Sequence, residues 1–87
     1  MTGTVRVWLV ERTYTDKGMV TLVYARPDGG GYLRRQLSEH MLGRTDVTAA
    51  MDVDPERLQP VREASERERY ATEATRVAET HDHDEAI

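Results

Sequence analysis

The residues with the clearest chemical potential lie at the end of the chain, where His81 and His83 alternate with Asp82 and Asp84. Imidazole and carboxylate groups are ligands for zinc and other divalent ions. A structural metal site needs ligands held by further hydrogen bonds, and this polar terminal stretch supplies none. We therefore expect no metal site and no cofactor, and a disordered acidic, histidine-containing tail over residues 81–87.

Groups for acid–base or nucleophilic catalysis are present but badly spaced. Ser38, Glu39 and His40 are consecutive, whereas a catalytic triad brings such groups together from separate elements. Acidic residues two apart, such as Asp52 and Asp54, do not share a helix face. The glycines at 29–31 join two predicted strands and lack the lysine of a phosphate-binding loop. The absence of cysteine excludes disulfides and thiolate chemistry, and we expect a protein that is not an enzyme.

The charged residues give information about the host organism and point to no particular enzymatic reaction. The chain holds 11 Arg against a single Lys17, 16 acidic residues, a net charge of −4, and no Asn or Phe. This bias is typical of a GC-rich genome, and the acidic excess is a device of halophilic proteins. No apolar run approaches the length of a membrane span, and the N-terminus lacks a signal-peptide pattern. We expect a cytoplasmic protein without membrane contact.

Three strands are predicted in the first half of the chain, at residues 5–13, 19–25 and 32–37, because β-branched and aromatic residues are frequent there. Residues 15–18 fit a three-residue hairpin loop with Gly18 in the left-handed conformation. Residues 26–29 fit a second turn that ends on Gly29. The third strand competes with a helix, since apolar residues between 33 and 41 also recur at helical spacing.

The second half of the chain predicts a long helix. Residues 47–53 fit either a short helix or a fourth strand, and we favour the strand. Asp54 and Pro55 begin a helix of about one turn. Ser65 and Glu68 form a capping pattern for a helix over 65–80, whose apolar stripe comprises Tyr70, Ala71, Ala74, Val77 and Ala78. The fold class is therefore α+β, a single domain over residues 1–80: an antiparallel three- to four-stranded meander with a C-terminal helix packed on one face.

Hairpin register separates the predicted sheet into two apolar faces. Loops of odd length place residues of like parity on one face, so the odd-numbered aliphatic residues are expected beneath the helix. The even-numbered face is then aromatic, and one helix leaves it uncovered. We predict a homodimer interface, or an interface with another protein, formed by Trp8, Val10, Leu22, Tyr24, Tyr32 and Arg34. The alternative is that residues 41–60 fold across this face within one chain.

A second hypothesis gives the same face to single-stranded nucleic acid, with bases stacked on Trp8, Tyr24 and Tyr32 and arginines at the phosphates. The net negative charge and the absence of the signatures of sheet-type RNA binders weigh against it. Protein association is the better prediction.

Several short strings are similar to those of a known family. They are the stretch 5–37, Asp46-Val47-Thr48-Ala49-Ala50, Arg57-Leu58-Gln59-Pro60-Val61 and Glu68-Arg69-Tyr70-Ala71. On these strings the chain resembles a small haloarchaeal protein family of unknown function, over nearly its whole length. The resemblance implies a halophilic, archaeal host and brings no catalytic or binding residues with it.

Overall fold

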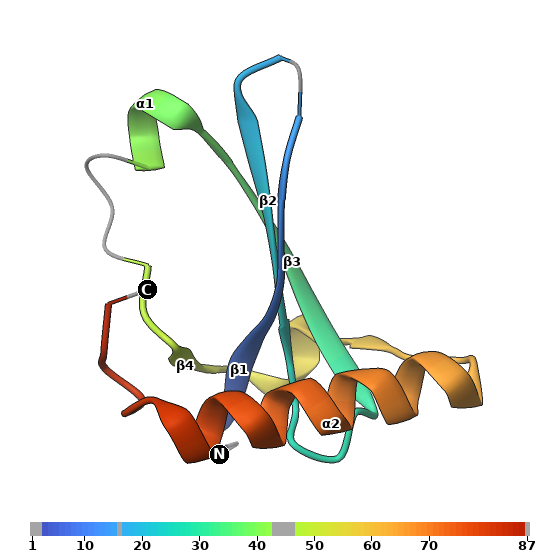
Figure 1. The fold of residues 1–87 in the computed structure, drawn as a ribbon. Helices are drawn as coiled ribbons and strands as arrows, with labels where there is room; N and C mark the ends of the chain where they lie inside the picture. Colours follow the sequence, from blue (N-terminus) through green and yellow to red (C-terminus); the bar gives the residue numbers. More distant parts are fainter. Residues whose placement is uncertain (1–2, 16, 43–46, 87) are drawn as a thin grey trace.

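A five-stranded antiparallel sheet and one long helix form the body of the protein (Figure 1). The computed structural model describes residues 3–15, 17–42 and 47–86. In chain order the elements are β1 (Val5–Tyr14), β2 (Met19–Ala25), β3 (Gly31–Ser38), α1 (Glu39–Leu42), β4 (Ala50–Val53), η1 (Pro55–Arg57), β5 (Gln59–Pro60) and α2 (Ala64–Thr80). The strand order is β4-β1-β2-β3-β5. The predicted α+β class and C-terminal helix are confirmed, with five strands instead of three to four.

The hairpin of β1 and β2 closes as its turn residues predict. The amide of Thr15 donates to the carbonyl of Met19 at 2.9 Å, and Gly18 has a φ of 75°. Glycine adopts this left-handed conformation without the Cβ clash that other residues suffer. Asp16, which the sequence places in the same turn, lies outside the described residues.

A β-bulge in β1 breaks the predicted parity of the faces. Leu9 pairs with Tyr24, but Glu11 pairs with Val23, so Val10 is an extra residue between the two pairs. An extra residue shifts the alternation of side chains on one strand relative to its neighbour. As a result Leu9 shares a face with Tyr24, which corrects the predicted separation of odd and even residues.

The turn between β2 and β3 has an even number of residues and shifts the register again. The amide of Arg26 donates to the carbonyl of Gly31 at 3.0 Å, which leaves the four residues 27–30 in the loop. The turn residues 26–29 predict a loop of odd length instead. With the observed loop, Tyr24 pairs with Leu33 and Val23 with Arg34, so β3 also presents its odd residues beside the even residues of β2.

Both faces of the sheet are covered by the chain itself. The helix α2 crosses one face, and the segment from β4 through η1 to β5 crosses the other (Figure 1). We call these the α2 face and the crossing face. The crossing face holds the larger core cluster, formed by Val7, Leu9, Val20, Leu22, Tyr24, Leu33, Val47 and Val53. The α2 face holds a smaller one, formed by Val23, Ala25, Val61 and Tyr70.

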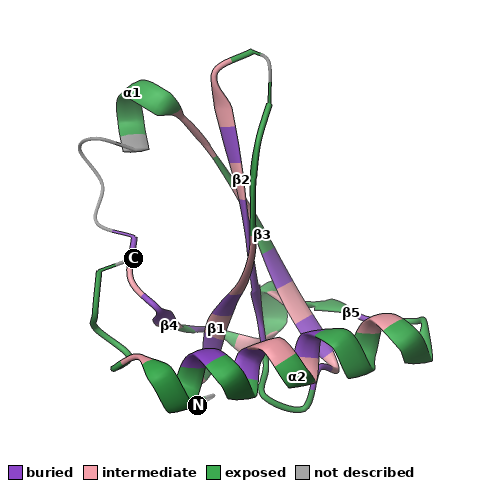
Figure 2. Cartoon of the chain, viewed as in Figure 1, coloured by how far each residue is buried: buried purple, intermediate pink, exposed green. Residues whose placement is uncertain are grey.

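Residues within 41–60 cover the face that holds Leu22 and Tyr24, as the single-chain alternative predicts for these two residues. Val47 and Val53 are buried members of the larger cluster, and Met51 and Leu58 pack against it. Buried residues of the sheet lie between this segment and α2 (Figure 2). The apolar residues on both sheet faces therefore have a covering layer without a second chain.

The helix α2 runs close to its predicted bounds. Its buried residues are Tyr70, Ala74 and Val77, whereas Ala78 is exposed. The N-cap is Glu63, without a side-chain cap bond, so Ser65 does not cap the helix as predicted. Asp54 does cap the short η1 helix, because its Oδ1 accepts from the amide of Glu56 at 2.9 Å.

The segment after α2 forms main-chain contacts with residues 48–50. The amide of Ala49 donates to the carbonyl of Glu85 at 2.9 Å, and the amide of Ala50 donates to that of His83 at 3.1 Å. Thr48 and Ala86 form an isolated antiparallel bridge. Paired main-chain groups hold this segment beside the start of β4.

Candidate functional site

The residues predicted to form one interface lie on two faces of the sheet. Trp8, Val10 and Tyr32 are half-buried and Arg34 is exposed, all on the α2 face. Leu22 and Tyr24 lie on the crossing face, with 0% and 2% of their surface exposed. Leu22 and Tyr24 therefore belong to the core of the single chain, which corrects the place of these two residues in the predicted six-residue interface. The bulge in β1 and the four-residue turn are the physical reason.

The three aromatic residues proposed to stack nucleic-acid bases are separated for the same reason. Trp8 and Tyr32 both pair with Ala25, from opposite sides, so they flank this fully buried residue on the α2 face. Tyr24 points to the opposite face. Base stacking on a sheet needs rings that share one open surface, and these three rings do not.

Two of the predicted residues, Tyr32 and Arg34, line an open groove of about 380 Å³ between β3, β5 and the start of α2. The rings of Tyr32 and Tyr70 are 6.1 Å apart and tilted by 51°, a favourable aromatic arrangement. The remaining lining residues are Gln59, Pro60, Val61, Arg62, Glu63 and Glu66. The helical pattern predicts Tyr70 on the buried stripe of the helix, but no local pattern predicts its contact with Tyr32.

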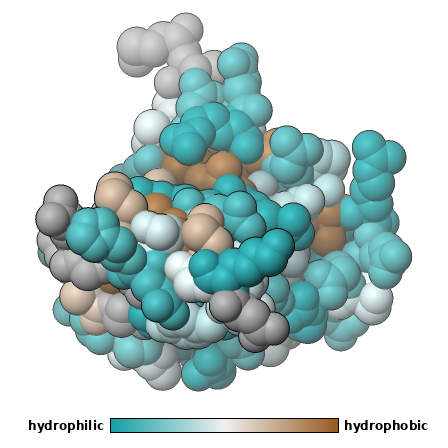
Figure 3. Space-filling view, turned by 90° about the horizontal axis from the view of Figure 1, so that it is seen from above, coloured by the Kyte–Doolittle hydropathy of each residue, from teal (hydrophilic) through white to brown (hydrophobic). Residues whose placement is uncertain are grey.

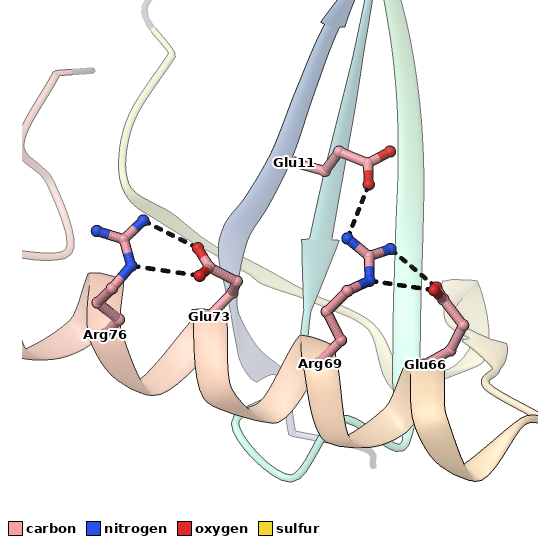
Figure 4. A network of polar contacts seen from close by, with 5 residues as sticks. All are labelled: Glu11, Glu66, Arg69, Glu73 and Arg76. Carbon is pink, nitrogen blue, oxygen red and sulfur yellow. Dashed lines mark hydrogen bonds and ion pairs between the residues drawn. The ribbon is translucent and has the colours of Figure 1, made fainter.

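A network of charged side chains fixes the helix beside this groove (Figure 4). Arg69 donates to both carboxylate oxygens of Glu66, at 3.1 and 2.9 Å, and to Glu11 on β1 at 3.2 Å. The hydrogen bonds from Arg69 lower the pKa of Glu66 and raise the pKa of Arg69 itself. The guanidinium of Arg67 donates to the carbonyl of Val61 at 2.9 Å. These contacts hold the groove wall and leave the Glu66 charge neutralised.

The edge of β3 beside the groove is only partly covered. β5 pairs with β3 at two residues, Gly31 and Tyr32, and the ladder goes no further. Because Arg26 and Gly31 form a hydrogen-bonded pair, the alternation of an antiparallel ladder directs the main-chain groups of Arg34 and Gln36 away from β2. Within the described part of the chain no strand pairs with these groups. We call residues 33–37 the open edge.

Charge, not apolar surface, distinguishes this region. Arg34 and Arg62 are exposed, and neither forms an ion pair with a described residue. Among the described residues, the exposed large hydrophobic side chains are Tyr14 at the end of β1 and Met41 in α1, and neither lines the groove. In the view from above, hydrophobic atoms occupy small areas between hydrophilic ones (Figure 3). An extended partner would meet free main-chain groups and cations here.

Comparison with known proteins identifies the family. A model of a family of unknown function matches residues 1–87. The chain belongs to DUF7967. A search of curated proteins finds no match, and a search of solved structures finds none either. Membership of DUF7967 agrees with the resemblance to a family of unknown function and assigns no residue a role.

The other candidate chemistry of this DUF7967 chain has structural partners. His81 Nδ1 pairs with the carboxylate of Glu85, which lowers the pKa of Glu85. Ser38 Oγ accepts from the amide of Met41 at 3.1 Å, and His40 is exposed. No three His, Asp or Glu side chains converge as metal ligands among the residues described. None of the described helices is both long and apolar enough to span a membrane.

Proposed function

We propose that this protein is a protein-interaction module that binds an extended segment of its partner along the open edge of β3. The observation that carries the proposal is that β3 has eight residues whereas β5 covers only two of them. Main-chain groups at a sheet edge are a template for an added strand, and peptide recognition often uses such an edge. The adjoining groove would receive side chains of the same segment.

The body of the sheet supports this proposal by its rigidity. β3 is paired with β2 over seven of its eight residues, from Met19↔Ser38 to Ala25↔Tyr32. Its half-buried Leu37 packs against the larger core cluster. An edge that is already held in an extended conformation loses little entropy when a strand is added.

The host and compartment remain part of the proposal. We infer a halophilic host from the 16 acidic residues, the near-absence of lysine and the lack of Asn and Phe. The archaeal origin is what the resemblance to a small haloarchaeal family implies, and the cytoplasm is proposed as the compartment. Self-association is included as one form of partner recognition, with a second copy of the chain at the open edge in place of the aromatic face.

The test uses a proline at the open edge. Gln36→Pro removes an amide that faces away from β2, so the β2–β3 ladder should survive. Leu37→Pro is the matched control. The amide of Leu37 faces Val20 on β2, so a proline at this position should break the β2–β3 ladder and unfold the chain. Circular dichroism and urea unfolding establish that Gln36→Pro is folded before binding is measured.

Binding is measured by selecting random extended peptides from a phage library on the wild-type chain and on Gln36→Pro. Peptides that are enriched on the wild type but not on Gln36→Pro are expected. A dimer seen by light scattering for the wild type alone would also support the open edge, with a second copy as the partner. Equal enrichment on both chains, or retention of a random oligonucleotide pool without peptide binding, would overturn the proposal.

A further inference from the structure

We infer that the segment recognised at the open edge is acidic, with two consecutive carboxylate side chains that pair with Arg34 and Arg35. This inference rests on the proposed function and names the chemistry of the partner. It follows from the placement of two adjacent arginines on opposite sides of one uncovered strand.

The register of β3 gives these arginines different faces. Arg34 is opposite Val23 and lies on the α2 face, whereas Arg35 is opposite Leu22 and lies on the crossing face. A strand added beside β3 would place one residue next to Arg34 and the next residue along next to Arg35. Directly opposed side chains on neighbouring strands are close enough to interact, and opposite charges stabilise such pairs. Two consecutive acids satisfy both positions.

Neither arginine is neutralised by the described part of the chain. Arg34 and Arg35 form no ion pair there, and Arg35 is near enough to the Tyr24 phenol to oppose the rise of its pKa. Like Arg34, Arg62 lines the groove at the end of the open edge. The acids of the groove wall are Glu66, already held by Arg69, and Glu63. The unneutralised charge of the edge is therefore positive.

The same charges disfavour a second copy of the chain as the occupant. Antiparallel pairing of β3 with β3 of another copy would bring two sets of Arg34 and Arg35 into one short ladder. Like charges directly opposite in a sheet are destabilising. An acidic segment of a different protein gains attraction at both positions, so it is the occupant to which the inference commits.

The rest of the open edge completes the recognition pattern. Both neighbours of β3 are antiparallel to it, and an added strand in line with β5 would share that direction. Such a strand would meet Leu37, Gln36, Arg35 and Arg34 in that order. Leu37 is half-buried and Gln36 exposed, so the expected pattern is apolar, polar, acidic, acidic.

Titration of the full chain with three blocked peptides tests this pattern. The peptides are acetyl-Thr-Val-Thr-Glu-Glu-Val-amide and its matched forms with Gln-Gln or Lys-Lys in place of Glu-Glu. Amide chemical shifts of Arg34 and Gln36 report binding at the edge. At about 0.15 M NaCl the Glu-Glu peptide should bind about fivefold more tightly than the Gln-Gln peptide, since two cross-strand charge pairs are gained. The Lys-Lys peptide should bind more weakly than either.

A charge reversal gives the matched control. Arg34→Glu, at an exposed position, should keep the fold and remove the preference for the Glu-Glu peptide over the Lys-Lys peptide, because each peptide then meets one opposite charge and one like charge at positions 34 and 35. Edge shifts with all three peptides and no dependence on their charge would overturn the acidic preference while leaving the interaction module intact. No shift at Arg34 and Gln36 with any peptide would overturn both, so the two failures are distinguishable.

Discussion

Arg69 on α2 donates a 3.2 Å hydrogen bond to Glu11 on β1, a residue 58 positions away in the sequence. This contact exists because the bulge at Val10 turns Glu11 toward α2. In a regular strand Glu11 would share the face of Leu9, on the opposite side of the sheet. One extra residue in β1 therefore determines how the helix is joined to the sheet.

The pair of Glu11 and Arg69 should show measurable energetic coupling. We expect a double-mutant cycle with Glu11→Gln and Arg69→Met to give about 0.5 kcal/mol, because both side chains are more than a third exposed and solvent screens them. Urea unfolding of the four chains gives the value. The Glu73 and Arg76 pair lies within α2 and is the control for effects on the helix alone. A coupling of zero would show that the contact does not stabilise the helix on the sheet.

Among the glycines in the described part of the chain, Gly29 should be the least tolerant of substitution. It has a φ of 74°, and a Cβ built there would lie 2.0 Å from the carbonyl oxygen of Arg67. Gly18 has nearly the same φ, but its nearest contact to such a Cβ is Glu39 Oε2 at 3.8 Å. Gly18→Ala is expected to lose about 1 kcal/mol from the left-handed backbone alone. Gly29→Ala must also displace α2 and should lose clearly more in the same thermal unfolding experiment; equal losses would contradict the close packing of this turn.

The fold class could be predicted because it depends on local patterns. The turn at Gly18, the cap at Asp54 and the stripe of Tyr70, Ala74 and Val77 are each encoded within a few residues. Two shifts of strand register were not predicted, the bulge in β1 and the four-residue loop between β2 and β3. The adjacent apolar residues Leu9 and Val10 interrupt alternation and are a signal for a bulge, but alternation alone does not say on which strand the extra residue falls.

The candidate site was harder to predict because it depends on long-range pairing. Tyr32 and Arg34 were among the predicted interface residues, and they do line the groove. Leu22 and Tyr24 were assigned to the same surface by parity, and two register shifts moved them to the core. The open edge of β3 follows from where β5 ends, which local propensity does not specify.

Leu22 should behave as a core residue and not as an interface residue. It is fully buried beside Tyr24 and the crossing segment. Leu22→Ala is expected to destabilise the chain by about 2–5 kcal/mol through lost burial and a residual cavity. Thr21→Ala, at the half-buried neighbour on the other face, should change the free energy of unfolding by only about 0.5 kcal/mol. If Leu22→Ala altered the oligomeric state without lowering the urea midpoint, the residue would lie in an interface after all.

The stability of the fold should decrease at acid pH as four hydrogen-bonded carboxylates become protonated. The pKa values of Asp52, Glu66, Glu73 and Glu85 are lowered by hydrogen bonds from Arg6, Arg69, Arg76 and His81. A lowered pKa in the folded state means that the stabilisation is present above the unfolded pKa, about 4 for these groups, and is lost as the pH falls through the folded values. Thermal unfolding from pH 7 to pH 3 (about one unit per step) should show the decline below about pH 4.5. A melting temperature that rises on acidification would contradict these pairs.

On the alkaline side the loss of stability should depend on Tyr24. Burial raises the pKa of its phenol, although Arg35 and Arg12 oppose the rise. Because the folded pKa is raised, the stabilisation is complete below the unfolded value of about 10 and is lost as the pH increases through the folded value. Burial also raises the pKa of Tyr70, so Tyr24→Phe should weaken the alkaline decline without removing it. The urea midpoint measured from neutral to alkaline pH gives the comparison, with Tyr14→Phe as the control at an exposed tyrosine. If the urea midpoints of Tyr24→Phe, Tyr14→Phe and the wild type all fall by the same amount as the pH rises, ionisation of the buried Tyr24 phenol does not cause the alkaline loss of stability.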